Sequence, residues 1–321
     1  MKNVSILGTG MYVPSRVVTN DDLTKVVETS DEWIASRTGI RSRHIVENEN
    51  TIELAYQASL EAIKHANVKL EEIDLVIVGT VTPENVFPST ASILQARLGL
   101  GEIMAFDLNA ACSGFVYSLD VADKMLRSGK FNKALVVGAE VLTKYVDWTD
   151  RNTCVLFGDG AGATILGEGT GDIIDTSSHT RGDVEKNLYG AGTPLKNLTN
   201  DTGNTVGNIE MNGREIFKFA TKQIPKSINN ILEKNDLTLD DIDYIVCHQA
   251  NERIIESAAN RLKVSMDKMF LNMDKYGNTS AASVPMALDE AIKTNKIKRG
   301  DTIVIIAFGA GLTWSTALIK Y

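Results

Sequence analysis

Apolar positions along the chain follow two alternating spacings. Residues 53–66 and 219–234 carry apolar side chains every three to four positions, which predicts amphipathic helices. A short β-branched run follows each of them, at 74–80 and 243–249, and predicts a strand. The first of these runs and a later one at 303–306 are continuously apolar over several residues, which is typical of strands buried on both faces. Alternating helices and strands indicate an α/β fold built in layers.

The second half of the sequence repeats the first. Residues 68–80 (VKLEEIDLVIVGT) align with residues 237–249 (LTLDDIDYIVCHQ) at an offset of 169. The same offset aligns LDVADK at 119–124 with LDEAIK at 288–293. Two blocks in register at one offset indicate an internal duplication.

The duplication predicts two similar α/β halves, about 1–170 and 171–321, packed against each other. In sheets of this kind, ligands bind outside the carboxyl ends of the strands. A site is therefore expected where strand ends of the two halves meet.

Composition and charge exclude several classes of protein. The 321 residues carry a net charge of −8, which disfavours nucleic acid as the main ligand. The chain contains no apolar run long enough to predict a membrane span, and its glycine-broken start indicates a strand rather than a signal peptide. Its three cysteines lack the spacing of disulfide frameworks or zinc sites, so we expect a cytoplasmic protein without a bound metal.

Cys112 is the first candidate for chemistry. It follows a short apolar run and precedes the helical pattern at 114–126, and its neighbours are alanine, serine and glycine. Small residues permit a tight strand-to-helix turn, and a helix start favours the nucleophilic thiolate. The alternative is an ordinary buried cysteine, which is how we interpret Cys154 and Cys247.

His248 and Asn278 are the second and third candidates. His248 ends the predicted strand at 243–247, where α/β enzymes place catalytic groups. Asn278 precedes the helix that the repeat pairs with the one after Cys112, although asparagine is also common in turns and helix caps. The repeat aligns Cys112 with Ala281, so all three candidates fall at matching junctions and are expected to converge on one cleft.

Longer motifs carry a resemblance to a known family. They are TSDEWIASRTGIRSRHI (29–45), AACSGF (110–115), LFGDGAGA (156–163), EMNGREIFKFA (210–220), HQANERI (248–254), YGNTSAASVP (276–285) and FGAGLTW (308–314). With Cys, His and Asn in this order, the chain resembles the β-ketoacyl-acyl-carrier-protein synthase III family of thiolase-like condensing enzymes along essentially its whole length. The resemblance implies a thiolase-like fold with two duplicated α/β halves in αβαβα layers.

The resemblance also implies a two-stage reaction that initiates fatty-acid synthesis. Cys112 would attack an acyl-CoA thioester and become acylated. Malonyl-acyl carrier protein would then lose CO2, and the resulting carbanion would attack the acyl-cysteine. His248 and Asn278 would donate hydrogen bonds to the malonyl thioester oxygen, and the backbone N–H groups of Cys112 and Gly309 would form the oxyanion hole. Acyl-CoA is a substrate in this scheme, and no permanently bound cofactor is expected.

The family pattern assigns binding roles to further residues. For CoA these are Trp33 and Arg151 on the two sides of the adenine, Arg37 and Thr38 at the nucleotide and its phosphates, and Gly213, Phe217 and Asn251 along the pantetheine tunnel. Stacking and guanidinium–phosphate contacts suit these residue types. The alternative for Trp33 is amphipathic packing.

Departures from the family pattern are few. Asn152 and Ser315 each replace an expected glycine, and Arg214 stands where a smaller polar residue is common. Asn152 and Arg214 bear on the CoA contacts rather than on the chemistry.

The resemblance further implies two protein partners. An acidic carrier protein requires a basic patch, for which the candidates are Lys218, Arg253 and Arg261, with Lys222 and Lys263 nearby. Solvated helix faces are the alternative for these cations. Phe87 matches a residue that enters the partner subunit's acyl pocket, which implies a homodimer, and its ring favours a short primer such as acetyl.

Three other functions remain open at this point. One is a related condensing enzyme that primes a secondary-metabolite pathway with the same Cys-His-Asn set. Another is a Cys-His hydrolase, which would require a base beside the thiol and an orienting carboxylate. The last is an inactive binding subunit, which the complete set of three residues disfavours.

Overall fold

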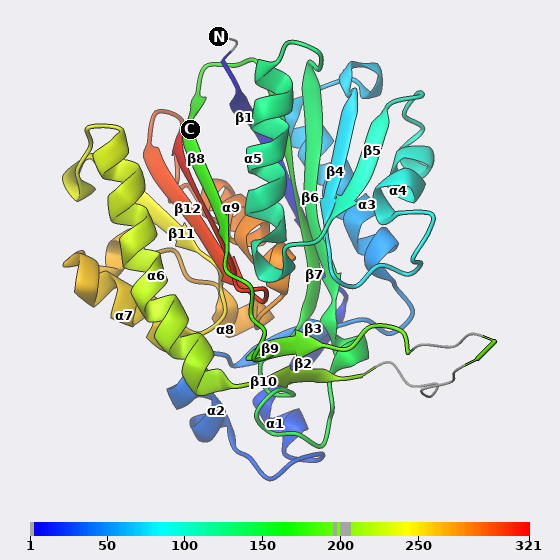
Figure 1. The fold of residues 1–321 in the computed structure, drawn as a ribbon, viewed down its shortest axis with the longest axis vertical. Helices are drawn as coiled ribbons and strands as arrows, with labels where there is room; N and C mark the ends of the chain where they lie inside the picture. Colours follow the sequence, from blue (N-terminus) through cyan, green and yellow to red (C-terminus); the bar gives the residue numbers. More distant parts are fainter. Residues whose placement is uncertain (1–2, 195–197, 200–206) are drawn as a thin grey trace.

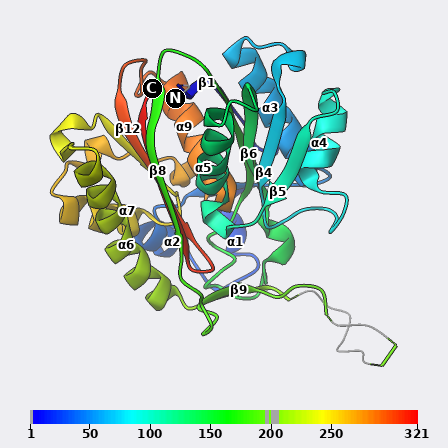
Figure 2. The same cartoon turned by 45° about the horizontal axis from the view of Figure 1, so that its top comes forward.

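The computed structural model describes residues 3–194, 198–199 and 207–321 and arranges them in five layers of alternating helices and sheets (Figure 1). Two sheets enclose a central pair of helices, α5 (Gly114–Arg127) and α9 (Ser283–Lys293), and other helices cover the outer face of each sheet (Figure 2). The αβαβα layering predicted from the family resemblance is confirmed.

The first sheet has the strand order β1-β7-β6-β4-β5. Its strands are β1 (Ser5–Tyr12), β4 (Leu75–Gly79), β5 (Met104–Leu108), β6 (Lys133–Val141) and β7 (Asp159–Gly167). β4 runs parallel to β5 and β6, while β7 is antiparallel to both β6 and β1. Helices α3 (Thr51–Ala66) and α4 (Thr90–Leu98) cover its outer face.

The second sheet has the order β11-β12-β13-β8. Its strands are β8 (Asp172–Thr180), β11 (Tyr244–Cys247), β12 (Thr302–Gly309) and β13 (Thr313–Lys320). β11 is parallel to β12, and the other pairs are antiparallel. Helices α6 (Gly213–Lys234) and α7 (Glu252–Leu262) lie on its outer face (Figure 1).

Smaller elements surround the ends of the sheets. The short strands are β2 (Arg16–Thr19), β3 (Ser42–Ile45), β9 (Leu188–Gly190) and β10 (Ile209–Met211), and the remaining α-helices are α1 (Asn20–Leu23), α2 (Asp31–Thr38) and α8 (Met273–Tyr276). The 3₁₀ turns are η1 (Leu70–Glu72), η2 (Ala111–Ser113), η3 (Leu142–Tyr145), η4 (Leu239–Asp241), η5 (Met266–Lys268) and η6 (Ser280–Ala282). None of the helices in the described ranges is both long and apolar enough to cross a membrane.

Strand β4 shows why continuously apolar runs form inner strands. Leu75 and Ile77 belong to the hydrophobic cluster around the central helices, while Val76 and Val78 belong to the cluster under α3 and α4. Successive side chains of a strand point to opposite faces, so a strand with helices on both sides must be apolar at every position. The predicted burial of this run is confirmed, since none of the four side chains is exposed.

The duplication predicted from the repeat also appears in the order of elements. Turns η2 and η6, helices α5 and α9, and strands β4 and β11 each begin 169 residues apart. The backbone conformation of the two turns also repeats, since Ala111 and Ser280 both have a positive φ, 48° and 50°. At the position that β5 holds in the first sheet, the second sheet has a single β-bridge, between Ile245 and Met269.

The two halves share the middle layer. β7 ends at Gly167 and β8 begins at Asp172. The strands of the first sheet all precede this short connection, and the strands of the second sheet all follow it. Helix α9, however, packs against β1 and β7 of the first sheet. The junctions at the start of α5 and of α9 therefore lie between both sheets.

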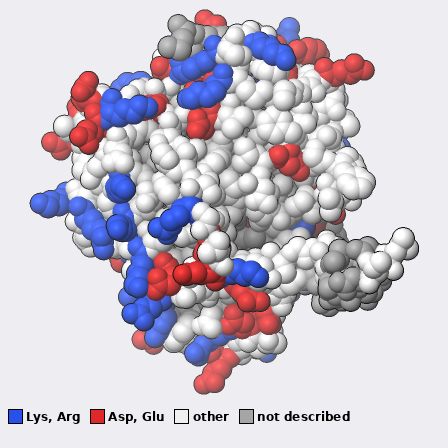
Figure 3. All heavy atoms as spheres, viewed as in Figure 1, with Lys and Arg blue, Asp and Glu red and all other residues white. Residues whose placement is uncertain are grey.

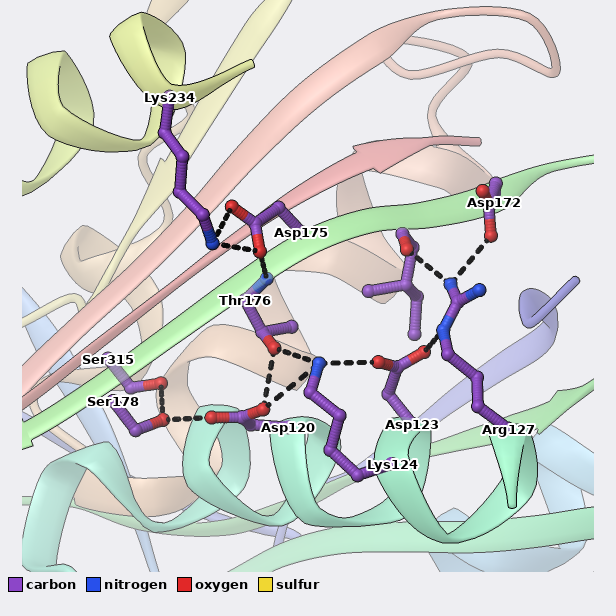
Figure 4. A network of polar contacts seen from close by, with 11 residues as sticks. Asp120, Asp123, Lys124, Arg127, Asp172, Asp175, Thr176, Ser178, Lys234 and Ser315 are labelled. Carbon is purple, nitrogen blue, oxygen red and sulfur yellow. Dashed lines mark hydrogen bonds and ion pairs between the residues drawn. The ribbon is translucent and has the colours of Figure 1, made fainter. Parts of the chain in front are cut away.

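A polar network joins α5 to the second sheet (Figure 4). Arg127 pairs with Asp123 in its own helix at 2.7 Å and with Asp172 on β8 at 2.9 Å. The hydroxyl of Ser315 lies 2.8 Å from that of Ser178 on β8, which in turn donates to Asp120 of α5. The serine that departs from the family pattern at position 315 thus adds a hydrogen bond that a glycine could not make.

Candidate active site

Cys112 lies in turn η2, just before α5. Ala111, which precedes it, has a φ of 48°, a conformation that few residues other than glycine adopt. Gly309 at the end of β12 approaches this turn so closely that a Cβ there would lie 2.7 Å from the Cys112 nitrogen. Glycine is therefore required at position 309, and its backbone lies beside that of Cys112.

The Cys112 thiol is buried, and burial opposes its ionisation. Burial raises its pKa to about 12; the hydroxyl of Ser280 and a backbone N–H lower it, and the charge of Glu140 raises it. Burial therefore opposes the thiolate that the helix start favours, and the sequence does not reveal how deeply the sulfur is buried. Deprotonation has to accompany the reaction.

His248 directly follows strand β11 and is 1% exposed. Its backbone N–H donates to the Ile306 carbonyl, and its Nδ1 lies 2.5 Å from the Ser283 hydroxyl. That hydroxyl also accepts the N–H of Gln249 at 3.4 Å, so its own hydrogen is available for Nδ1. Burial lowers the pKa of His248 to about 3, so the ring is neutral, and from the Ser283 contact we infer that its hydrogen lies on Nε2.

Asn278 lies between α8 and η6 and is 7% exposed. Its Oδ1 accepts the N–H of Ser280 at 2.9 Å, which is the turn role that its sequence context allowed. Because this bond engages the oxygen, the side-chain NH2 group is the donor that Asn278 can offer to a ligand. The turn and the ligand-facing roles are thus compatible.

Cys112, His248 and Asn278 line one cavity of about 210 Å³. Cys112 comes from the first half of the chain, and His248 and Asn278 come from the second. The convergence predicted from the repeat is what the structure shows. Phe308 closes the cavity beside His248, with its ring edge-on to the imidazole at 5.1 Å between centroids.

The residues predicted to bind CoA line the same cavity. They are Trp33, Arg37, Thr38, Arg151, Gly213, Phe217 and Asn251, and Asn152 lies among them. The guanidinium groups of Arg37 and Arg151 lie 4.5 and 4.6 Å from the centre of the Trp33 ring. An adenine can stack on this ring only if a guanidinium first moves away from it.

Three details at the mouth of this cavity differ from the simplest expectation. Thr38 is 4% exposed and its hydroxyl donates to the Ile34 carbonyl, so that hydrogen is not available to a phosphate. Asn152 is tied to Asp150 by a 3.0 Å hydrogen bond. Arg214 is exposed in the first turn of α6 and does not line the cavity.

Cys112 also borders a second cavity, of about 530 Å³, which sequence reasoning missed. Its apolar lining includes Leu142, Phe157, Leu188 and Ile209. These residues come from four separate segments without a shared motif, so no sequence signal marked them. Phe87, by contrast, is 84% exposed and borders neither cavity of its own chain.

Within the described ranges, no cluster of three or more His, Cys, Asp or Glu side chains could hold a metal ion. The donors around Cys112 are instead neutral hydrogen-bonding groups. A duplicated five-layer α/β fold with Cys, His and Asn at its matching junctions defines the class of thiolase-like condensing enzymes.

Comparison with known proteins narrows the class. Residues 106–182 match the family model described as 3-oxoacyl-[acyl-carrier-protein (ACP)] synthase III, and residues 232–321 match its C-terminal part. The chain is 49% identical to the β-ketoacyl-[acyl-carrier-protein] synthase III of Clostridium acetobutylicum, over 100% of this chain and 99% of that one. It is 51% identical to the enzyme of Xanthomonas campestris, over 98% of each chain.

A solved structure agrees with these relatives. The 3-oxoacyl-[acyl-carrier-protein] synthase III of Aquifex aeolicus matches with a TM-score of 0.92 and 47% identity, over 99% of this chain and 100% of that one. The chain belongs to the β-ketoacyl-acyl-carrier-protein synthase III family. It is an acyltransferase-class condensing enzyme that initiates fatty-acid synthesis, and the comparisons do not favour the secondary-metabolite alternative.

Proposed function

We propose that this protein condenses a short acyl-CoA, acetyl-CoA in the first instance, with malonyl-acyl carrier protein, releasing CoA and CO2. The observation that carries the proposal is the single cavity that Cys112 shares with His248, Asn278 and the predicted CoA residues. Formation of β-ketoacyl-carrier protein from the two substrates tests it, and a panel of straight, branched and long acyl-CoAs tests the choice of primer.

In the first stage, the sulfur of Cys112 attacks the thioester carbon of acyl-CoA and the CoA thiolate leaves. Negative charge develops on the thioester oxygen. The backbone N–H groups of Cys112 and Gly309 are the donors proposed to hold it, and their close approach supports this role. No bound cofactor is required, because the chain itself supplies the nucleophile and the donors.

In the second stage, loss of CO2 from the malonyl group leaves an enolate. Nε2–H of His248 and the side-chain NH2 of Asn278 are proposed to donate to its oxygen. Both donors are neutral and nearly buried, so they stabilise developing negative charge in a site with little competing water. The enolate carbon then attacks the acyl-cysteine, and the C–S bond breaks to release the Cys112 sulfur.

Replacing Trp33 with alanine should weaken CoA binding without changing the chemistry. Loss of one stacking surface costs about 1–2 kcal/mol, which corresponds to a KM for acetyl-CoA raised on the order of 10-fold. We expect kcat to change by less than about twofold, because uniform binding affects KM alone. Steady-state kinetics measure both constants, with Trp148→Ala, which borders neither cavity, as the matched control. An unchanged KM in Trp33→Ala would show that Trp33 only packs.

We propose that the carrier protein docks on the outer helices of the second half. Lys218 on α6 and Arg253 and Arg261 on α7 are exposed. Lys and Arg side chains gather on the flank formed by these helices, at the left of Figure 3. Lys218 is partly offset by Glu215 at 2.9 Å, so the arginines should contribute more.

Arg253→Glu should raise the KM for malonyl-carrier protein by about 10-fold or more, because a like charge replaces an attractive one at the interface. The KM for acetyl-CoA should stay the same, and the difference between wild type and variant should shrink as salt screens the charges. Lys296→Glu, an exposed charge outside these helices, serves as the control. Equal effects of the two reversals would contradict docking at α7.

We further propose a cytoplasmic homodimer. β5 is an edge strand, and Val86, Phe87 and Met104 near it are exposed apolar side chains. Figure 3 shows few charged side chains on the face over strands β4 to β6. An apolar face beside an unpaired strand edge favours pairing with a second copy, which would bring Phe87 to the partner's acyl cavity. The free thiols of all three cysteines are consistent with a reducing compartment.

A further inference from the structure

Glu140, at the end of β6, is a buried carboxylate to which the condensation mechanism assigns no role. It is 0% exposed, and it accepts hydrogen bonds from the hydroxyls of Thr80 and Thr82 at 3.2 and 2.7 Å and from the Val81 N–H at 3.1 Å. Its other oxygen accepts the Ser280 hydroxyl at 3.1 Å. In the described part of the chain no Lys or Arg forms a salt bridge with it. A buried carboxylate held only by neutral donors is costly, which points to a function.

Ser280 connects this carboxylate to the nucleophile. Its hydroxyl donates to Glu140, turn η6, which carries it, packs against turn η2, which carries Cys112, and both residues border the same larger cavity. Its N–H holds the Oδ1 of Asn278. Ser280 adopts a φ of 50°, a conformation that costs a non-glycine residue roughly 1–2 kcal/mol. The surrounding structure must therefore hold this serine in place.

The electrostatics of the pair suit proton exchange. Burial raises the pKa of Glu140 to about 7, although the bonds from Thr82, Val81, Ser280 and Thr80 lower it. The charge of Glu140 is one cause that raises the pKa of Cys112, so a proton on Glu140 makes the thiolate easier to form. The other titratable groups that face Glu140 are Lys144, which donates to the Thr82 and Pro83 carbonyls, and Tyr145.

We propose that Glu140 takes the proton of the Cys112 thiol through the Ser280 hydroxyl during acylation and returns it when condensation releases the thiolate. This inference rests on the proposed function and adds a base to it. In the free enzyme the chain runs from S–H to the serine oxygen and from the serine O–H to the carboxylate. Glu140 is a positioning and proton-holding residue, since it reaches the substrate only through Ser280 and Cys112.

Protons and bonds balance over the cycle. In acylation the S–H bond breaks, its proton passes to the serine oxygen, and the serine proton passes to Glu140. The thiolate displaces CoA thiolate, which takes a proton from solvent. In condensation the acyl–sulfur bond breaks, the serine O–H protonates the thiolate, and Glu140 returns its proton to the serine. While the enolate exists Glu140 is neutral, so the site holds one negative charge rather than two.

Alkylation of Cys112 by iodoacetamide, followed by mass spectrometry of its peptide, tests the relay without any acyl substrate. In the wild type the rate should rise with pH and level off near pH 7, because the base must be unprotonated to accept the thiol proton. Glu140→Gln should lower the rate at pH 7 about 100-fold, the size of a general-base contribution. Its rate should keep rising above pH 9, because hydroxide replaces the missing base.

Ser280→Ala keeps the carboxylate and removes the connection, so it should show the same pH profile as Glu140→Gln. Glu290→Gln, a carboxylate bonded to Asn272 and Lys275 outside both cavities, should behave as the wild type. A wild-type profile in Glu140→Gln or in Ser280→Ala overturns the relay, and so does a wild-type rate that does not level off near pH 7. Failure of the condensation assay with these alkylation profiles intact would instead reject the proposed function alone.

Discussion

Cys112→Ala should lose the acyl adduct that acetyl-CoA leaves on the wild-type protein. Among the cysteines of the described residues, Cys112 alone borders both the cavity lined by the predicted CoA residues and the larger apolar cavity. Removing a nucleophile should lower condensation by on the order of 10⁴-fold or more. Intact-mass measurement after mixing with acetyl-CoA detects the adduct directly.

Cys247→Ala is the matched control for this experiment. Cys247 is also buried, 1% exposed against 9% for Cys112, but it belongs to the apolar cluster under α6 and α7, on the opposite face of the sheet from the central helices. The adduct should persist in this variant. Cys112→Ala should also still decarboxylate malonyl-carrier protein slowly, because His248 and Asn278 remain, and that activity shows that the site is folded. An adduct that survives in Cys112→Ala would reject the nucleophile assignment.

The sequence predicted the strands and junctions that position the site, because these depend on periodicity and repetition. The continuously apolar run within 74–80 predicted that β4 is buried on both faces, and the offset of 169 related the junctions of Cys112 and Asn278. Both features are patterns of residue type along the chain, and a sequence records such patterns directly.

The depth at which a side chain is buried, and contacts between distant segments of the chain, could not be predicted in the same way. The pKa of Cys112 depends on how much structure encloses the sulfur, and burial is the largest cause that raises it. Glu140 and Ser280 are 140 positions apart, and nothing in their local sequence indicates that they form a hydrogen bond. The exposure of the Phe87 side chain likewise could not be predicted from its local sequence, and it is explained only if a second chain covers this residue.

The tautomer of His248 also emerges only from tertiary contacts. Ser283 lies 35 positions away, at the start of α9, and its hydroxyl fixes which ring nitrogen carries the hydrogen. The repeat aligns Ser283 with Gly114, the first residue of α5. The second junction therefore carries a hydroxyl that orients the histidine where the first carries a small residue beside the thiol.

His248→Ala should separate the two stages of the reaction. Cys112 should still become acylated, because its proposed oxyanion donors are backbone N–H groups. Decarboxylation of malonyl-carrier protein should fall by about 10²–10³-fold, the cost of removing one donor to a developing oxyanion. Intact mass follows the first stage, and CO2 release follows the second.

The pH dependence and a milder variant make this test specific. Because burial lowers the pKa of His248 to about 3, the ring stays a neutral donor from pH 8 down to pH 5, and protonation of His248 should cause no loss of decarboxylation in that range. Ser283→Ala removes the hydroxyl that fixes the tautomer, and it should lower decarboxylation by about 10-fold while acylation is unchanged. If His248→Ala decarboxylates at a near-normal rate, the donor role is wrong. If the wild-type rate instead falls with an apparent pKa near 6.5, the ring is not held neutral by burial.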